Sequence, residues 1–178
     1  TAEELALIEP LAVDGAGSYL EFSNTADALA AAAPGYGVNA AWPGDALISF
    51  SGTSASAPIL AGAIAATMSQ GDGVTLNAQQ AAAVVLANLN EAGFPGDDPL
   101  YGGGLLDLGR VMRRDEAGVV DAAVASQVLD WPEGGGSPQL LVTVENRGTE
   151  MLVNSSVNVH GTALGSTRNF LHVSDGGV

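Results

Sequence analysis

Apolar positions in the first fifty residues come in short runs that end at turn residues. Residues 5–13 form one apolar run that ends at Asp14-Gly15, and residues 28–33 form another that ends at Pro34-Gly35. Residues 20–22 and 37–42 are two further short runs. Runs of this length, bounded by glycine and proline, are typical of buried strands. The pattern predicts a series of short strands with tight connections.

The pattern changes at Ser54. Residues 54–69 are rich in alanine, apolar on nearly every side, and long enough for about four helical turns. A helix without a polar face must be buried. Pro58 stands close enough to the start to be tolerated there. We therefore predict a buried helix that begins near Ser54.

A second helix is indicated by Asn77 as its N-cap, with Gln80 three residues later, and it should stop at Gly93 and Pro95. Residues 93–104 are rich in glycine, proline and aspartate and predict a loop. Residues 105–112 predict a short third helix. Its C-terminal end gathers arginines, which complement the helix dipole.

The character of the chain shifts after Asp115. Residues 119–129 are mixed and apolar, residues 132–138 form a Gly/Pro-rich linker, and residues 139–145 alternate like a strand. A hairpin turn is predicted at Asn146-Arg147-Gly148, with a returning strand over 151–159. We predict an α/β domain over 1–114, with parallel strands covered by helices. A linker over 115–138 and an incomplete all-β, Ig- or fibronectin-like sandwich over 139–178 follow it.

Composition narrows the chemistry. The chain has twenty acidic residues, five arginines, no lysine and no cysteine, and a net charge of −15. Missing lysine excludes Ser-Lys and Schiff-base catalysis, and missing cysteine excludes disulfides and thiolate sites. The negative field repels nucleic acid and anionic membranes, and no stretch of about 20 apolar residues predicts a membrane span. Adaptation to salt and a coding bias explain the acidic, alanine-rich composition equally well.

The string Gly52-Thr53-Ser54-Ala55-Ser56-Ala57-Pro58 carries the candidate chemistry. A serine in the first turn of a buried helix suits nucleophilic attack. The helix dipole favours negative charge there, and the Ser54 N–H is aimed where a tetrahedral oxyanion would form. Gly52 allows a tight turn and leaves room for a substrate.

These residues resemble the nucleophile motif of the subtilases, the subtilisin-like serine peptidases of family S8. The match comprises Gly52, Thr53, Ser54, Ala57, Pro58, Ala61 and Gly62. Three further elements stand in the family's order, namely Phe22-Ser23-Asn24, Ala33-Pro34-Gly35 and Tyr101-Gly102-Gly103-Gly104-Leu105. Four ordered motifs make a specific signal. The resemblance covers roughly residues 5–113 and implies the C-terminal part of a three-layer α/β/α catalytic domain.

The resemblance also assigns roles. It implies a serine endopeptidase that hydrolyses protein or peptide substrates through an acyl-enzyme on Ser54, with Thr53 and Ser56 as positioning neighbours. Ala33-Pro34-Gly35 would at most border the substrate pocket. It further implies secretion or display on the surface of a bacterial or archaeal cell. Calcium enters only by analogy with the family, and no cofactor is predicted.

The family places its Asp, His and oxyanion-hole Asn before the serine, and all three are absent here. Thr1 opens without an initiator methionine or a signal sequence, so we expect upstream sequence to have been lost, and with it the N-terminal part of the same domain. His160 and His172 follow Ser54 and are interpreted as surface or strand histidines. We expect the chain to be inactive alone.

Other interpretations have less support. An α/β-hydrolase elbow would need glycine at position 56, and the glycines at 102–104 lack the lysine of a phosphate loop. Asp97 and Asp98, with Asp72 and Asp107 elsewhere, are interpreted as solvated loop acids, and no metal site is predicted. Trp42 and Trp131 are interpreted as packing residues.

The main alternative is a non-catalytic adhesion or binding protein, in which a degenerate subtilase-like domain supports the β segment. The intact Gly-Thr-Ser favours an enzyme.

Overall fold

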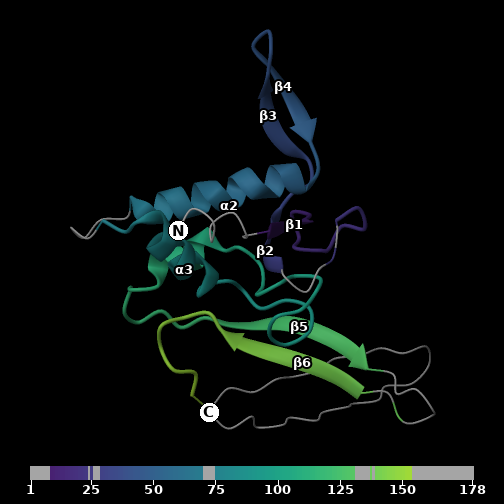
Figure 1. Ribbon diagram of the computed structural model, residues 1–178. Coiled ribbons are helices and arrows are strands. Elements are labelled where there is room, and N and C mark those ends of the chain that lie inside the picture. Colours follow the sequence, from purple (N-terminus) through teal and green to yellow (C-terminus); the bar gives the residue numbers. More distant parts are fainter. Residues whose placement is uncertain are drawn as a thin grey trace.

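The computed structural model describes residues 9–23, 25, 29–69, 75–130, 137 and 139–153. Its body is an α/β fold in which a parallel pair of strands, β1 (Glu9–Val13) and β2 (Leu29–Pro34), lies against helices (Figure 1). The helices are α2 (Thr53–Met68), α3 (Ala78–Leu86) and α4 (Leu108–Arg113). The predicted parallel strands with helical cover are confirmed for this part.

Successive residues of β2 face opposite sides, as the pleat of a strand requires. Ala31 packs with residues of the helices, and Ala32 packs with β1. The helical side of the core holds Leu60, Val85, Leu89 and Val111. The other side holds Leu11 and Val13, with Tyr19, Leu29, Tyr101 and Leu105 packed against them. Alanine on β2 lets both layers approach the strand closely.

The helix predicted to begin near Ser54 begins at Thr53 and runs to Met68. Its complete burial is not observed in the described part of the chain. Ala55, Ser56, Leu60, Ala63 and Thr67 are buried, and they recur at helical spacing on the face toward β1, β2 and α3. Another set of small residues is exposed, namely Ala57, Pro58, Ala61, Gly62 and Ala65. Patterning alone could not say which face the chain itself covers.

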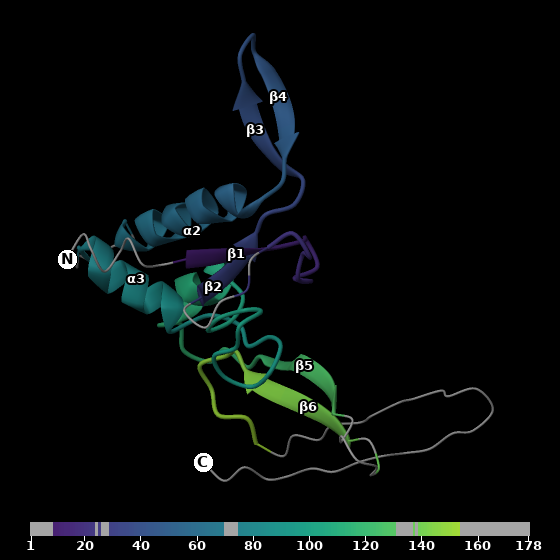
Figure 2. The same ribbon diagram turned by 45° about the vertical axis from the view of Figure 1, so that its right-hand side comes forward.

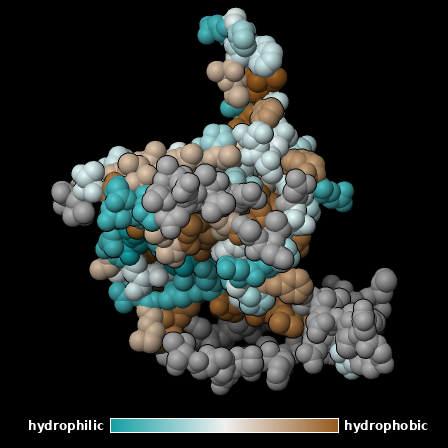
Figure 3. Space-filling view, in the orientation of Figure 1, coloured by the Kyte–Doolittle hydropathy of each residue, from teal (hydrophilic) through white to brown (hydrophobic). Residues whose placement is uncertain are grey.

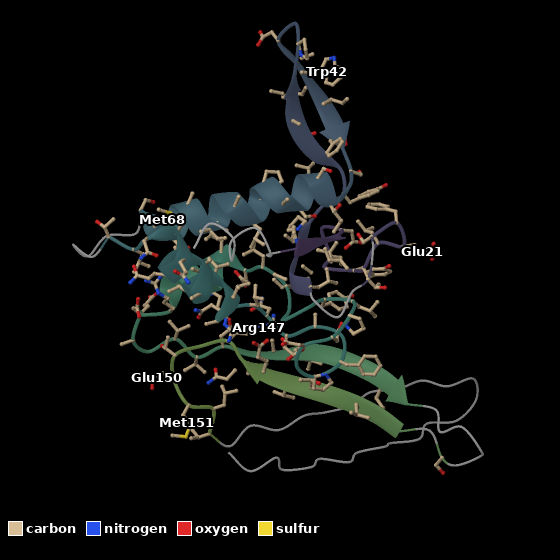
Figure 4. The ribbon with its side chains drawn as sticks, viewed as in Figure 1. Glu21, Trp42, Met68, Arg147, Glu150 and Met151 are labelled. Atoms are coloured by element: carbon tan, nitrogen blue, oxygen red, sulfur yellow. The ribbon has the colours of Figure 1, made fainter. Side chains whose placement is uncertain are left out.

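Between β2 and α2 the chain forms an antiparallel hairpin, β3 (Val38–Trp42) and β4 (Ala46–Phe50). The first strand was expected from residues 37–42, and the second was not. The hairpin stands away from the body in both views (Figures 1 and 2). Apolar side chains on it are exposed, including that of Trp42, which therefore does not pack in a core here (Figures 3 and 4).

The predicted strand at residues 20–22 is wrong. Residues 21–23 form a turn, in which the Ser23 N–H donates to the Leu20 carbonyl oxygen over 2.8 Å. The predicted capping box of α3 is confirmed: Gln80 N–H donates to Asn77 Oδ1 over 2.9 Å, and Asn77 N–H donates to Gln80 Oε1 over 3.0 Å. The third helix starts at Leu108 rather than 105, because the side chain of Asp107 caps it.

Below the body lies an antiparallel pair, β5 (Ala122–Asp130) and β6 (Gln139–Asn146). β6 was expected, whereas β5 lies inside the range predicted as a linker. The predicted hairpin turn at 146–148 is wrong. Arg147 N–H donates to the Asp121 carbonyl oxygen over 2.8 Å and Thr149 N–H to that of Val119 over 2.9 Å, so the segment extends the β5–β6 pairing. Residues 151–153 form no strand.

Several predicted features lie outside the described residues. They are Asn24, Asp72, Trp131, residues 132–136, the strand residues 154–159, His160, Arg168 and His172. No helix among the described residues is long and apolar enough to cross a membrane.

Candidate active site

Ser54 is the second residue of α2, directly after a glycine N-cap. Gly52 has φ 148° and ψ 167°, a backbone conformation that is essentially restricted to glycine. It offers no side-chain cap, and the first turn of α2 holds no acidic residue. The N–H groups of a first helical turn have no acceptor within the helix. At α2 the Ala55 N–H donates to the Gly52 carbonyl oxygen over 2.9 Å, and the remaining first-turn donors and the positive end of the dipole are presented without a competing carboxylate.

The side chain of Ser54 lies on the solvent side of this turn. Thr53 and Ser54 are exposed, whereas Ala55 and Ser56 are buried. The Ser54 hydroxyl makes no hydrogen bond to any residue that the structure describes, so it is available to an incoming group. The expectation that it protrudes from the opening turn of a helix agrees with these positions.

Ser56 connects the helix start to the predicted Ala33-Pro34-Gly35 turn. Its hydroxyl is fully buried and donates to the Ala33 carbonyl oxygen over 3.1 Å. Gly52 N–H donates to the Gly35 carbonyl oxygen over 2.7 Å. A Cβ at position 35 would lie only 2.9 Å from the Gly52 carbonyl oxygen, so only glycine permits this approach. The two motifs, about twenty residues apart in the chain, are fixed against each other.

Of the three residues expected to border a substrate, Ala33 and Gly35 are buried and Pro34 is exposed. The carbonyl of Ala33 is engaged by Ser56. Any contact of Ala33 or Gly35 with a substrate would use the backbone, whereas Pro34 has its ring available.

The remaining two motifs stabilise the strands. Ser23 is buried, and its hydroxyl donates to the Ala12 carbonyl oxygen over 3.2 Å and accepts from Ala12 N–H over 3.3 Å, which fixes it to β1. Residues 101–105 run beside β2. Ala32 N–H donates to the Gly104 carbonyl oxygen over 2.8 Å, and Leu106 N–H donates to that of Ala32 over 2.8 Å. Three of the four motifs thus meet at β2: Ala33-Pro34-Gly35 at its end, the serine motif through Ser56, and residues 101–105 beside it.

The loop acids behave differently from the expectation. Asp98 is buried, with 7% of its surface exposed, and accepts from the N–H groups of Phe94, Leu100 and Tyr101. Its carboxylate therefore holds the loop together through backbone hydrogen bonds and is not a solvated acid, whereas Asp97 is exposed. Among the described residues, no three histidine, cysteine or acidic side chains lie close enough together to hold a metal ion.

Asp107 also has a structural position. Its side chain accepts from Arg110 N–H over 3.0 Å and from Asn90 Nδ2 over 2.9 Å. Partial burial raises the pKa of Asp107, but these hydrogen bonds and the charge of Arg113 outweigh it, so that the pKa is lowered. The carboxylate is therefore the stable form at the start of α4.

Sequence reasoning missed a polar cluster between the body and β6. Arg110 Nη1 donates to Glu145 and, over 2.7 Å, to the Leu89 carbonyl oxygen. Glu145 also accepts from Arg147 Nε over 3.0 Å and from Glu91 N–H over 2.9 Å. Burial raises the pKa of Glu145, but its hydrogen bonds to the two arginines outweigh this effect, so the pKa is lowered. Only the concentration of arginines after residue 109 could have pointed to this cluster.

Comparisons with known proteins give a consistent result. The model of the subtilase family matches residues 11–104, more than half of the 178-residue chain. Among solved structures, the prenylagaramide maturation protease PagA is similar at 27% identity and a TM-score of 0.54, over 60% of this chain and 41% of that one. The patellamide maturation protease PatA gives 26% and 0.54, over 62% and 43%. A comparison with curated protein sequences gives no match. The chain spans about two fifths of the length of the two proteases.

Proposed function

The chain belongs to the subtilase family, and from this premise we propose that it is the serine-bearing part of an endopeptidase that cleaves peptide bonds through an acyl-enzyme on Ser54. The observation that carries the proposal is the open start of α2. Exposed Ser54 stands there, and neither a side-chain cap nor an acidic side chain of the first turn competes for its own N–H.

In the proposed reaction, Ser54 Oγ attacks the carbonyl carbon of the scissile bond and loses its proton to a general base. The tetrahedral oxyanion is held by the Ser54 N–H, and each such donor is worth a few kcal/mol of transition-state stabilisation. Collapse of the intermediate releases the amine and leaves an ester on Ser54, which water then hydrolyses. Thr53 and Ser56 act as positioning residues, and Ser56 does so through its bond to Ala33.

The base and the second oxyanion donor are proposed to come from the family's Asp, His and Asn, in an N-terminal part of the same domain. None of the described residues is a histidine, because His160 and His172 lie outside them. A serine without such a base is a weak nucleophile. We therefore expect residues 1–178 alone to leave peptide substrates uncut.

The remaining assignments are proposals as well. Residues 1–114 form the catalytic part. Residues 139–178 belong to an incomplete Ig- or fibronectin-like sandwich, to which β5, inside the range 115–138 expected as a linker, also contributes a strand. Val124 and Val144, which lie opposite each other on β5 and β6, are exposed, which suits a sheet with one face open to a second layer. Secretion, or display on a bacterial or archaeal cell surface, rests on family resemblance. The alternative of a non-catalytic adhesion protein is disfavoured by the intact Gly52-Thr53-Ser54 and by the exposed hydroxyl.

The test uses a longer polypeptide that carries these residues together with the family's Asp, His and Asn. A fluorophosphonate probe should label it, and mass spectrometry should place the label on the peptide that contains Ser54. Ser54→Ala should abolish labelling and lower peptidase activity by at least about a thousandfold. Ser69→Ala, at the other end of α2 with an exposed hydroxyl, is the matched control and should retain both. Full activity in Ser54→Ala, or a label on another serine, would overturn the proposal.

A further inference from the structure

Four of the five arginines in this acidic chain surround one small cavity. Arg110, Arg113 and Arg114 come from α4 and its C-cap, and Arg147 follows β6. The cavity has a volume of about 70 Å³. Figure 4 shows Arg147 where the β5–β6 pair meets the body. No lining residue belongs to α2, β3 or β4, so the cavity is separate from the surroundings of Ser54.

Glu145, Asp115 and Asp107 interact with arginines of the cavity. Both oxygens of Glu145 are engaged: one accepts from Arg110, and the other accepts from Arg147 and from the Glu91 N–H. Asp115 pairs with Arg114 Nε over 3.1 Å, although its own side chain is 78% exposed. Asp107 lies at the start of α4, where its carboxylate caps the helix. No acidic side chain lines the cavity itself.

Helix stability alone does not explain the cluster. Cations favour the C-terminal end of a helix, which accounts for Arg113 and Arg114. Arg110 lies in the last turn as well and donates to Glu145, whereas Arg147 belongs to another element, so the dipole does not explain why Arg147 joins the other three. Like charges brought together repel, and the chain has a surplus of acids elsewhere with which arginines could pair. The arrangement has a physical reason if a negative group occupies the cavity.

We propose that this cavity binds a small oxyanion, either a carboxylate or a phosphate group. The planar guanidinium fork matches both groups with two parallel hydrogen bonds. The volume of the cavity is well above the minimum of about 10–15 Å³ that a single water requires, so the cavity has room for one such group.

Of the four arginines, Arg113 has the guanidinium group that is least engaged by the rest of the described chain. Its one hydrogen bond to a described residue runs from Nε to the Gly109 carbonyl oxygen over 3.3 Å, and its side chain is exposed. Arg110 and Arg147 are held in place by Glu145, with 18% and 23% of their side chains exposed. An anion bound among them would connect α4 to the segment after β6, and would therefore stabilise the junction between the body and the β5–β6 pair.

The test titrates the complete protein with inorganic phosphate by calorimetry, with sodium chloride holding the ionic strength constant. Arg113→Gln should weaken phosphate binding roughly tenfold, as expected for a lost hydrogen bond between charged groups. Arg113→Lys, which keeps the charge and loses the fork, should fall between it and the wild type. Gln79→Glu is the matched control: it makes the same change in net charge at the start of α3, on an exposed side chain, and should bind almost normally.

A second arm identifies the source of the anion. A capped peptide of several glutamates is titrated in place of phosphate, and each ligand is then tested in competition with the other. Tighter binding of phosphate identifies a free ion, and tighter binding of the peptide identifies polypeptide carboxylates; both support the site. The proposal would be overturned if neither phosphate nor the peptide bound. It would also be overturned if Arg113→Gln and Gln79→Glu weakened phosphate binding equally. Ser54→Ala should leave both titrations unchanged, which separates this site from the proposed peptidase.

Discussion

The first turns of α2 and α3 present their backbone amides in opposite ways. At α3 the side chains of Asn77 and Gln80 exchange hydrogen bonds with the backbone and satisfy two donors. At α2 the N-cap is Gly52, which has no side chain to offer. A polar N-cap typically stabilises a helix by about 1 kcal/mol. The chain forgoes that stabilisation at the helix that carries Ser54, where the proposed peptidase would use the open amides.

Capping the open terminus should produce the largest effect. In Gly52→Asp the new carboxylate would accept from the first-turn amides, including that of Ser54, and would compete with an oxyanion for them. Loss of one oxyanion donor typically lowers kcat by about a hundredfold or more. We expect at least this decrease in kcat of the complete peptidase, measured with a fluorogenic peptide.

Gly52→Ala is the control for backbone strain, because any side chain at φ 148° costs about 1–3 kcal/mol. It carries no carboxylate, so its kcat should fall less than that of Gly52→Asp. An equal loss in both variants would mean that strain, and not competition for the amides, explains the effect.

Loosening the support of the open terminus is the next test. Ser56→Ala removes the buried hydroxyl that donates to the Ala33 carbonyl oxygen. The free energy of unfolding should fall by about 1–1.5 kcal/mol in urea titrations, as expected for one lost buried hydrogen bond. Ser69→Ala removes an exposed hydroxyl at the C-cap of the same helix and should stay within about 0.5 kcal/mol of the wild type. A stable Ser56→Ala with unchanged peptidase activity would show that the link between the two motifs is dispensable.

Opening the capped terminus should have a smaller effect. Asn77→Ala removes the acceptor for Gln80 N–H and should lower the free energy of unfolding by about 1 kcal/mol. Because α3 contributes no residue to the surroundings of Ser54, kcat should not change. Asn77→Gly should cost only a few tenths of a kcal/mol, since glycine is itself tolerated at an N-cap. A large loss of activity in Asn77→Ala would end the distinction between a stabilising and a functional helix start.

The features predicted correctly from the sequence are local ones. The capping box of α3 needs only Asn77 and Gln80, three residues apart, and the start of α2 needs only the change of pattern at Ser54. The subtilase motifs are equally short, and the family match confirms the resemblance that they indicated.

The features that were missed depend on partners far along the chain. Residues 146–148 have the composition of a turn, yet the amides of Arg147 and Thr149 pair with carbonyls of residues 119 and 121. Arg110 and Glu145 lie 35 residues apart, and no periodicity connects them. Asp98 looked like a solvated acid because its three donors come from the fold of its own loop. Pattern indicates which residues are apolar, but only the assembled fold decides what each face meets.

The smallest effect should appear at the third helix start, that of α4, because its cap is charged. The pKa of Asp107 is lowered in the folded protein, where hydrogen bonds from Arg110 N–H and Asn90 and the charge of Arg113 outweigh burial. Stability from this carboxylate is fully present above the pKa of an unfolded aspartate, about 3.9, and is lost as the pH falls through the lower folded value. Asp107→Asn should therefore flatten the pH dependence of unfolding below about pH 4, measured by circular dichroism, whereas Asn77→Ala should leave its shape unchanged because amides do not titrate. An identical acid transition in Asp107→Asn and wild type would mean that the charge of this cap contributes nothing.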